Sequence, residues 1–177
     1  MQEDKIAEIS RLVAEHESEL CRYAVRLLRD SQLAKDAVQE AFIQYLRNSQ
    51  GKASVEVANA RAWLFKATRN KCLDILKSAR HKHETTDENM HEWTDESPAP
   101  DEIAEKNDMM EIVRKKLASL PERDRELLCL KLEHGRSYKE ISEITGLSIS
   151  NVGFILHTAI KRLARELQQE GIIDHER

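Results

Sequence analysis

The chain has 177 residues, of which 40% are hydrophobic and 34% are charged. This length allows one medium domain or two small ones. With only five glycines and three prolines, an all-β protein rich in tight turns is excluded. No apolar run approaches the roughly 18 residues of a membrane span, and the N-terminus has no signal-peptide core. We therefore expect a cytoplasmic protein without membrane insertion.

The first half of the chain shows apolar residues at helical spacing. The spacing predicts helices over residues 5–29, 32–47 and 60–80, with a break at Asp30 and Ser31. A loop is expected between the second and third helices. Most of the apolar stripes are core, and Trp63 is assigned to the core with them.

Charge is distributed unevenly along the chain, although the formal net charge is only -4. Residues 61–83 hold seven Lys/Arg against one Asp, whereas residues 84–108 hold ten Asp/Glu and one Lys. The acidic stretch contains two prolines and no periodic apolar pattern, which is typical of a disordered linker. The prediction is therefore an all-α fold: two small helical domains, 1–83 and 109–177, joined by an acidic flexible linker over 84–108.

The second half predicts a short helix over 109–118 and another from Glu122 to about His134, with Pro121 at its first position and Gly135 as its C-cap. Ser137 and Glu140 have the spacing of a capping box at the start of a further helix, which ends at Gly146. Ser148 can cap the helix that follows. Two helices joined by a short glycine-containing turn predict a helix-turn-helix.

In this motif the second helix enters the DNA major groove through its outward residues. Asparagine can bond adenine, phenylalanine can touch a thymine methyl, and cations can hold phosphates. Phe154 and Ile155 make the expected DNA face unusually apolar, and Gly153 would permit close backbone approach. An amphipathic helix without a DNA role is the alternative. The candidate residues are Ser150, Asn151, Phe154, His157, Thr158, Lys161, Arg162 and Arg165, with Ser137 and Tyr138 at the start of the preceding helix.

The cysteines and histidines give no sign of a metal site. Cys21, Cys72 and Cys129 are far apart in the sequence and form no CxxC pair. His81 and His83 lie in a basic run without accompanying ligands. We expect no metal, cofactor or catalytic residue.

Four segments together resemble the extracytoplasmic-function (ECF, group four) subfamily of the sigma-70 family of bacterial RNA polymerase sigma factors. Residues 36–42 (DAVQEAF) resemble the family's polymerase-binding helix, and residues 62–74 (AWLFKATRNKCLD) resemble its helix near the promoter minus-ten element. Residues 120–126 (LPERDRE) and 137–141 (SYKEI) resemble the segment leading to the minus-thirty-five reader.

The resemblance implies a factor that lends promoter specificity to core RNA polymerase and has no catalytic site or small-molecule substrate. Its partners would be the core polymerase, promoter DNA and, in addition, an anti-sigma factor or other regulator. Residues 1–83 would be sigma domain two, and 109–177 would be sigma domain four, which reads the minus-thirty-five element. The resemblance places the polymerase contacts on Asp36, Gln39, Glu40 and Phe42. The candidates for the melted minus-ten strand are Arg61, Lys66, Arg69, Asn70, Lys71, Lys77 and Arg80.

Two other classes of protein remain open at this point. A stand-alone helix-turn-helix regulator would bind duplex DNA without polymerase, but the segments at 36–42 and 62–74 argue against it. A helical adaptor would sequester another transcription factor, with the apolar recognition helix as its docking surface. An enzyme is least supported, because the sequence has no P-loop, metal cluster or paired catalytic carboxylates.

Overall fold

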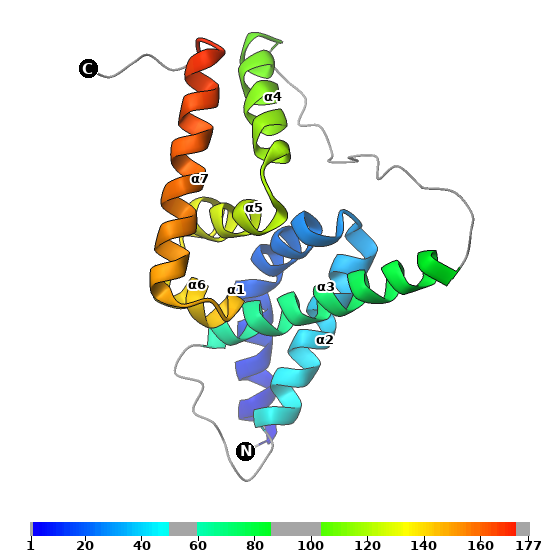
Figure 1. Ribbon diagram of the computed structural model, residues 1–177. Helices are drawn as coiled ribbons and strands as arrows, with labels where there is room; N and C mark the ends of the chain where they lie inside the picture. Colours follow the sequence, from blue (N-terminus) through cyan, green and yellow to red (C-terminus); the bar gives the residue numbers. More distant parts are fainter. Residues whose placement is uncertain (1, 50–59, 86–103, 173–177) are drawn as a thin grey trace. The chain divides into compact units, whose positions relative to one another are not determined.

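The structure is a computed structural model that describes residues 2–49, 60–85 and 104–172 (Figure 1). These residues form helices and the turns between them, without a strand, so the all-α prediction is confirmed for them. The helices fall into two compact units: α1–α3 belong to the first, and α4–α7, apart from residues 143–145 at the end of α6, belong to the second. Among these ranges, no helix combines the length and apolar character needed to cross a membrane. Most of the predicted linker, residues 86–103, lies outside the described residues.

The first unit begins with α1 (Gln2–Leu28) and α2 (Ser31–Ser49), separated by the predicted break. Arg29 ends α1 with φ of 54°, a left-handed conformation that stops a helix. Asp30 then starts α2, because its Oδ1 accepts hydrogen bonds from the N–H groups of Gln32 and Leu33, both at 2.8 Å.

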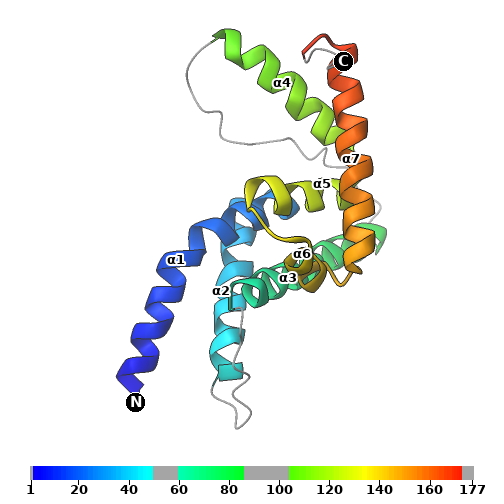
Figure 2. The same cartoon turned by 90° about the vertical axis from the view of Figure 1, so that its left-hand side faces the viewer.

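The third helix, α3 (Ala60–Thr85), completes a three-helix packing in which each helix contacts the other two (Figures 1 and 2). Leu20 and Tyr23 of α1, Val38 of α2, and Leu64 and Phe65 of α3 are fully or almost fully buried. The Tyr23 and Phe65 rings lie 5.2 Å apart in a tilted arrangement, which is a favourable aromatic geometry. The apolar stripes of the three helices thus meet in one core.

The assignment of Trp63 to the core is wrong. The buried side of α3 is formed by Leu64, Phe65, Thr68 and Cys72, whereas Trp63 is only half-buried. Its ring meets Tyr45 of α2 edge-on, with 5.4 Å between ring centroids. Trp63 therefore lies at the boundary of the core, where α2 and α3 come to the surface.

The second unit begins with α4 (Ala104–Ser119), which starts five residues before the predicted helix, and continues with α5 (Glu122–Leu128). Pro121 is the N-cap of α5 and not its first helical residue, with ψ of 144°. Its carbonyl accepts the first helical hydrogen bond from the N–H of Arg125 at 3.0 Å. The helix continues directly from α5 into one further turn, η1 (Cys129–Glu133). This turn is a π-helix, which the sequence did not predict.

The predicted capping of the last two helices is confirmed. At the start of α6 (Tyr138–Thr145), the Ser137 Oγ accepts from the Glu140 N–H at 3.1 Å, and the Glu140 carboxylate accepts from the Ser137 N–H at 2.9 Å. Gly146 ends α6 with φ of 77°. Ser148 then caps α7 (Ile149–Gln169) by accepting from the Asn151 N–H at 3.2 Å. The turn between α6 and α7 is therefore fixed by its own residues.

The two long helices of the second unit, α4 and α7, contact one another, and Figure 2 shows that they diverge from this contact toward the N-terminal end of α4. Lys116 of α4 and Glu170, just beyond α7, form an ion pair of 2.9 Å. This hydrogen bond raises the pKa of Lys116. On the buried side of α7, Val152, Leu156 and Ala159 are at most 1% exposed. α7 therefore presents its opposite side to solvent.

Candidate nucleic-acid interface

The solvent side of α7 carries the residues predicted to contact duplex DNA. At 100° per residue, these side chains project over one side of the helix, opposite Val152 and Leu156. The exposed candidates on α7 are Ser150, Asn151, Phe154, His157, Thr158, Lys161, Arg162 and Arg165. Arg162 also donates to Glu166 at 2.9 Å, so its guanidinium is held along the helix.

The start of α6 supports this surface from the neighbouring helix. Tyr138 is 41% exposed, and its ring lies beneath Lys131, whose Nζ is 5.2 Å from the ring centroid. A Cβ placed on Gly153 of α7 would be 3.5 Å from the Tyr138 ring. Gly153 therefore faces Tyr138, and a methyl group at this position would meet the ring at an ordinary van der Waals distance, so packing within the unit does not require a glycine.

The apolar character of α7 differs from the prediction. Phe154 is 70% exposed, as predicted for the DNA face, but Ile155 is 4% exposed and belongs to the core. Two exposed apolar residues were missed, Ile149 and Ile160, at 51% and 45%. They are eleven residues apart and thus share a side of α7 that is different from that of Phe154.

A second candidate surface follows α3. Lys66, Asn70 and Lys77 are exposed. They share one side of the helix, because residues that are four or eleven positions apart point in nearly the same direction from the helix axis. Arg80 is exposed and Arg69 is half-buried on an adjacent stripe. Lys71 projects about 140° away from Lys66 around the helix, so the structure does not bring it onto the same face.

An open pocket of about 190 Å³ lies beside this stripe, between α2 and α3. It is lined by Trp63, Gln44, Asn70, Lys66 and Ala67. A ring face, amides and a cation are groups that stack on a base, bond to its edge and attract its phosphate. Gln44 and Trp63 were not among the predicted site residues.

Arg61 lies at the N-terminal end of α3 and is engaged within the first unit. Its Nε and Nη2 donate to the two carboxylate oxygens of Glu19 in α1, at 3.0 and 2.7 Å. The Glu19 side chain is only 12% exposed. The guanidinium of Arg61 therefore has a structural partner, and its DNA contact stays a prediction.

The outward side of α2 carries the predicted polymerase contacts. Asp36 and Gln39 are exposed, and Glu40 is partly so. Two apolar residues on the same side are also exposed, Leu33 at 37% and Ile43 at 41%. Leu33 is three residues before Asp36 and Ile43 is three residues after Glu40, so both lie next to these carboxylates on the helix surface. Phe42, in contrast, is 8% exposed and contributes to the core. Ile43 is seven residues, or about two helical turns, after Asp36, so helical spacing alone could have placed it on this side of α2.

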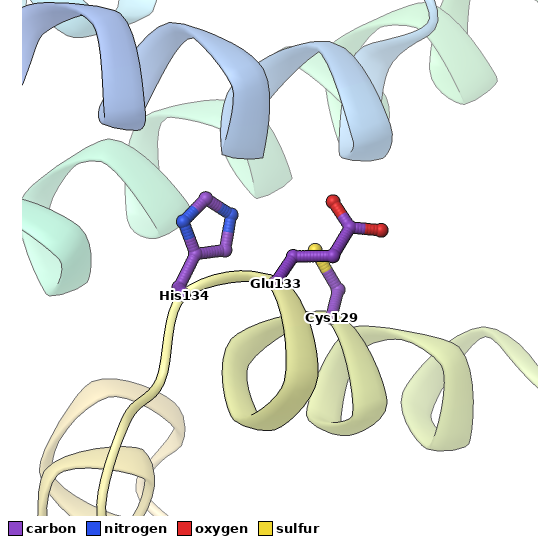
Figure 3. A group of neighbouring side chains, drawn as sticks. All are labelled: Cys129, Glu133 and His134. Carbon is purple, nitrogen blue, oxygen red and sulfur yellow. The ribbon is translucent and has the colours of Figure 1, made fainter.

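One group of side chains in the second unit has the composition of a metal site. Cys129, Glu133 and His134 each bring a ligand atom to within 4.8 Å of the others (Figure 3). The sequence predicted no such group. In an α-helix, residues 129 and 134 would point about 140° apart, so helical spacing alone does not reveal it.

The two units match two family models of known proteins. The Sigma-70 region 2 model matches residues 12–82, and the Sigma-70, region 4 model matches residues 110–163. The first match covers helices α1–α3, and the second covers helices α4–α7. The fold and the paired regions define a sigma-70 type transcription factor.

Whole-chain relatives define the subfamily. The ECF RNA polymerase sigma factor SigL of Mycobacterium tuberculosis is 31% identical over 163 residues, covering 91% of this chain and 89% of SigL. SigM of Bacillus subtilis, also an ECF RNA polymerase sigma factor, is 27% identical, covering 89% of this chain and 93% of SigM. The chain belongs to the ECF family of RNA polymerase sigma factors.

Solved structures share the fold at lower sequence identity. The sigma factor RpoE of Bartonella quintana, determined with the anti-sigma factor NepR, has a TM-score of 0.70 at 20% identity, covering 91% of this chain and 97% of RpoE. CnrH, determined with the cytosolic domain of CnrY, has a TM-score of 0.60 at 22% identity, covering 91% of this chain and 88% of CnrH.

Proposed function

We propose that this chain binds core RNA polymerase and directs it to promoters. The first unit would contact polymerase and the melted minus-ten strand, and the second would read the minus-thirty-five duplex. One observation carries the proposal: polar and cationic residues occupy the exposed side of α7, directly behind the Ser148 cap, in a chain that also has the region 2 bundle. A stand-alone regulator would have no use for that bundle.

In the second unit, recognition would divide between the two ends of α7. Asn151 and Phe154, near the N-terminal end, are placed for base edges, because that end of a recognition helix enters the major groove. Lys161 and Arg165, two to four turns further on, would hold phosphates. Tyr138, supported by Gly153 and Lys131, would border the groove from α6.

In the first unit, the pocket between α2 and α3 would hold a base from the opened duplex. Extruding a base costs a few kcal/mol of lost stacking, which contacts in a pocket can offset. The Trp63 ring would stack, while Asn70 and Gln44 would bond to the base edge. Lys66 and Lys77, on the same side of α3, would follow the phosphates of the single strand.

The outward side of α2 would dock on the polymerase. Exposed Asp36 and Gln39 would supply polar contacts and Leu33 and Ile43 apolar contact, a mixture that matches a protein interface. The chain would have no catalytic step or cofactor of its own. Since core polymerase is cytoplasmic, this location follows for the chain. An anti-sigma factor or other regulator is a further proposed partner, with the exposed pair Ile149 and Ile160 available as its contact.

The test is co-elution of the purified chain with sigma-free core RNA polymerase on a sizing column. A stoichiometric complex is expected, and the double substitution Asp36→Ala/Glu40→Ala is expected to weaken it. Glu122→Ala/Glu143→Ala is the matched control, because it removes two exposed carboxylates from α5 and α6 and leaves α2 intact.

Each other result points to a different class of protein. Tight binding to duplex DNA without any polymerase complex would indicate a stand-alone regulator. Neither interaction would favour the helical adaptor. Equal weakening by the two double variants would remove α2 from the polymerase interface.

A further inference from the structure

The end of the α5–η1 helix has an unusual geometry. The N–H of His134 donates to the carbonyl of Cys129 at 3.2 Å, which is a hydrogen bond between residues five apart. The N–H of Arg136 reaches still further back, to the carbonyl of Leu130 at 2.9 Å. Such π-turns are rare and occur often at functional sites. The wide turn brings residues 129 and 134 toward the same side of the helix.

Three side chains with different ligand atoms gather there. The Cys129 thiol, the Glu133 carboxylate and the His134 imidazole project from the same side of the helix (Figure 3). Their ligand atoms all lie within 4.8 Å of one another. In tetrahedral zinc sites, with bonds of about 2.0–2.3 Å, ligand atoms lie about 3.5 Å apart. Side-chain rotations that move the ligand atoms by about an ångström would thus bring all three within bonding distance of one ion.

We propose that Cys129, Glu133 and His134 form a binding site for a divalent transition metal ion, with Zn²⁺ as its natural occupant. Thiolate, imidazole and carboxylate are the three protein ligand types of zinc. Magnesium and calcium take oxygen ligands and are disfavoured by the sulfur. The thiolate and the carboxylate together balance the charge of the ion. Three protein ligands leave a fourth position for water or an exogenous ligand.

The site is connected to the helix-turn-helix through a short chain of hydrogen bonds. Arg136 Nε donates to the His134 carbonyl at 2.6 Å, and Arg136 Nη1 donates to Glu140 at 3.3 Å. Glu140 in turn accepts from the Ser137 N–H in the capping box of α6. An ion bound to His134 would therefore restrain the loop from which α6 begins, and occupancy would stabilise the second unit.

The experiment titrates the reduced, tag-free full chain with Zn²⁺ in competition with a coloured chelator. A parallel titration with Co²⁺ monitors the thiolate-to-cobalt charge-transfer absorption. We expect one ion per chain, a charge-transfer band, and an upward shift of the thermal unfolding midpoint with Zn²⁺. Cys129→Ser and His134→Gln should each weaken binding at least about tenfold, and Cys129→Ser should remove the band.

The controls keep the result interpretable. Cys21→Ser and His157→Gln remove one thiol and one imidazole outside the group and should leave the Kd unchanged. Glu133→Gln alters an exposed side chain, so it should keep the helical circular dichroism signal while weakening binding about tenfold. The absence of one-to-one binding, or a band and a Kd that survive Cys129→Ser, would overturn the proposal. The measurement needs neither polymerase nor DNA and is therefore independent of the proposed function.

Discussion

Arg61 and Glu19 connect α3 to α1 through a two-pronged ion pair, with donor–acceptor distances of 3.0 and 2.7 Å between the guanidinium and the two carboxylate oxygens. The residues are 42 positions apart in the sequence. The Glu19 side chain is 12% exposed and that of Arg61 is 40% exposed. A residue that the sequence assigned to DNA binding therefore also fixes the start of the basic helix relative to the rest of its unit.

Arg61→Ala should lower the free energy of unfolding by about 1–2 kcal/mol, because it leaves a largely buried carboxylate without its guanidinium. Urea denaturation of Arg61→Ala, Glu19→Gln and the double variant measures the coupling between the two residues. The double variant should be less destabilised than the sum of the single variants. Additive losses would show that the pair contributes nothing beyond its separate side chains.

The fold was largely predictable because local signals and apolar spacing agree along the chain. Asp30, the Ser137–Glu140 capping box and Ser148 each mark a helix start, and the structure has each of these caps. The predictions for Ile155 and Trp63 were wrong because the size and hydrophobicity of a side chain do not specify whether it is buried at the margin of an apolar helix face. Burial there depends on how the neighbouring helices pack, which the local sequence does not encode.

The candidate site was less predictable, since it depends on contacts between distant segments. The DNA face of α7 follows from one helix and its cap, so its exposure could be inferred. The pocket lined by Gln44 and Trp63 requires α2 and α3 to meet, and the grouping of Cys129 with His134 requires a π-turn. The helical spacing of apolar residues indicates neither which helices will pack together nor where a π-turn will form.

Thr68→Val should stabilise the first unit by about 1 kcal/mol. Thr68 is fully buried, and its Oγ1 has no hydrogen-bond partner among the described residues. Replacing an unsatisfied buried hydroxyl by a methyl of similar size removes a desolvation cost. Thr158→Val, on the exposed side of α7, is the matched control and should change the unfolding free energy little. Destabilisation by Thr68→Val would reveal a hydrogen bond to this hydroxyl.

Gly153→Ala should stabilise α7 by up to about 1 kcal/mol, the difference in helix propensity between the two residues. The added methyl would meet the Tyr138 ring at 3.5 Å, an ordinary van der Waals distance. Gly146→Ala is the contrasting variant, since φ of 77° at residue 146 strains any residue with a side chain and should lower stability. Thermal unfolding of both variants checks the prediction. A lower midpoint for Gly153→Ala would show that Tyr138 cannot accommodate the methyl.

Asn151→Ala and Lys161→Ala should separate base reading from phosphate binding on α7. Both residues are exposed on the same side of the helix, about three turns apart. Asn151→Ala should relax discrimination at one base pair at a cost of about 1–3 kcal/mol, whereas Lys161→Ala should weaken all sequences alike and reduce the salt slope by about one. The measurement is binding of the polymerase complex to promoter variants over a range of salt concentrations. Equal losses on specific and random DNA for Asn151→Ala would assign it to the backbone, and the sequence reading would then fall to Phe154 and its neighbours at the N-terminal end of α7.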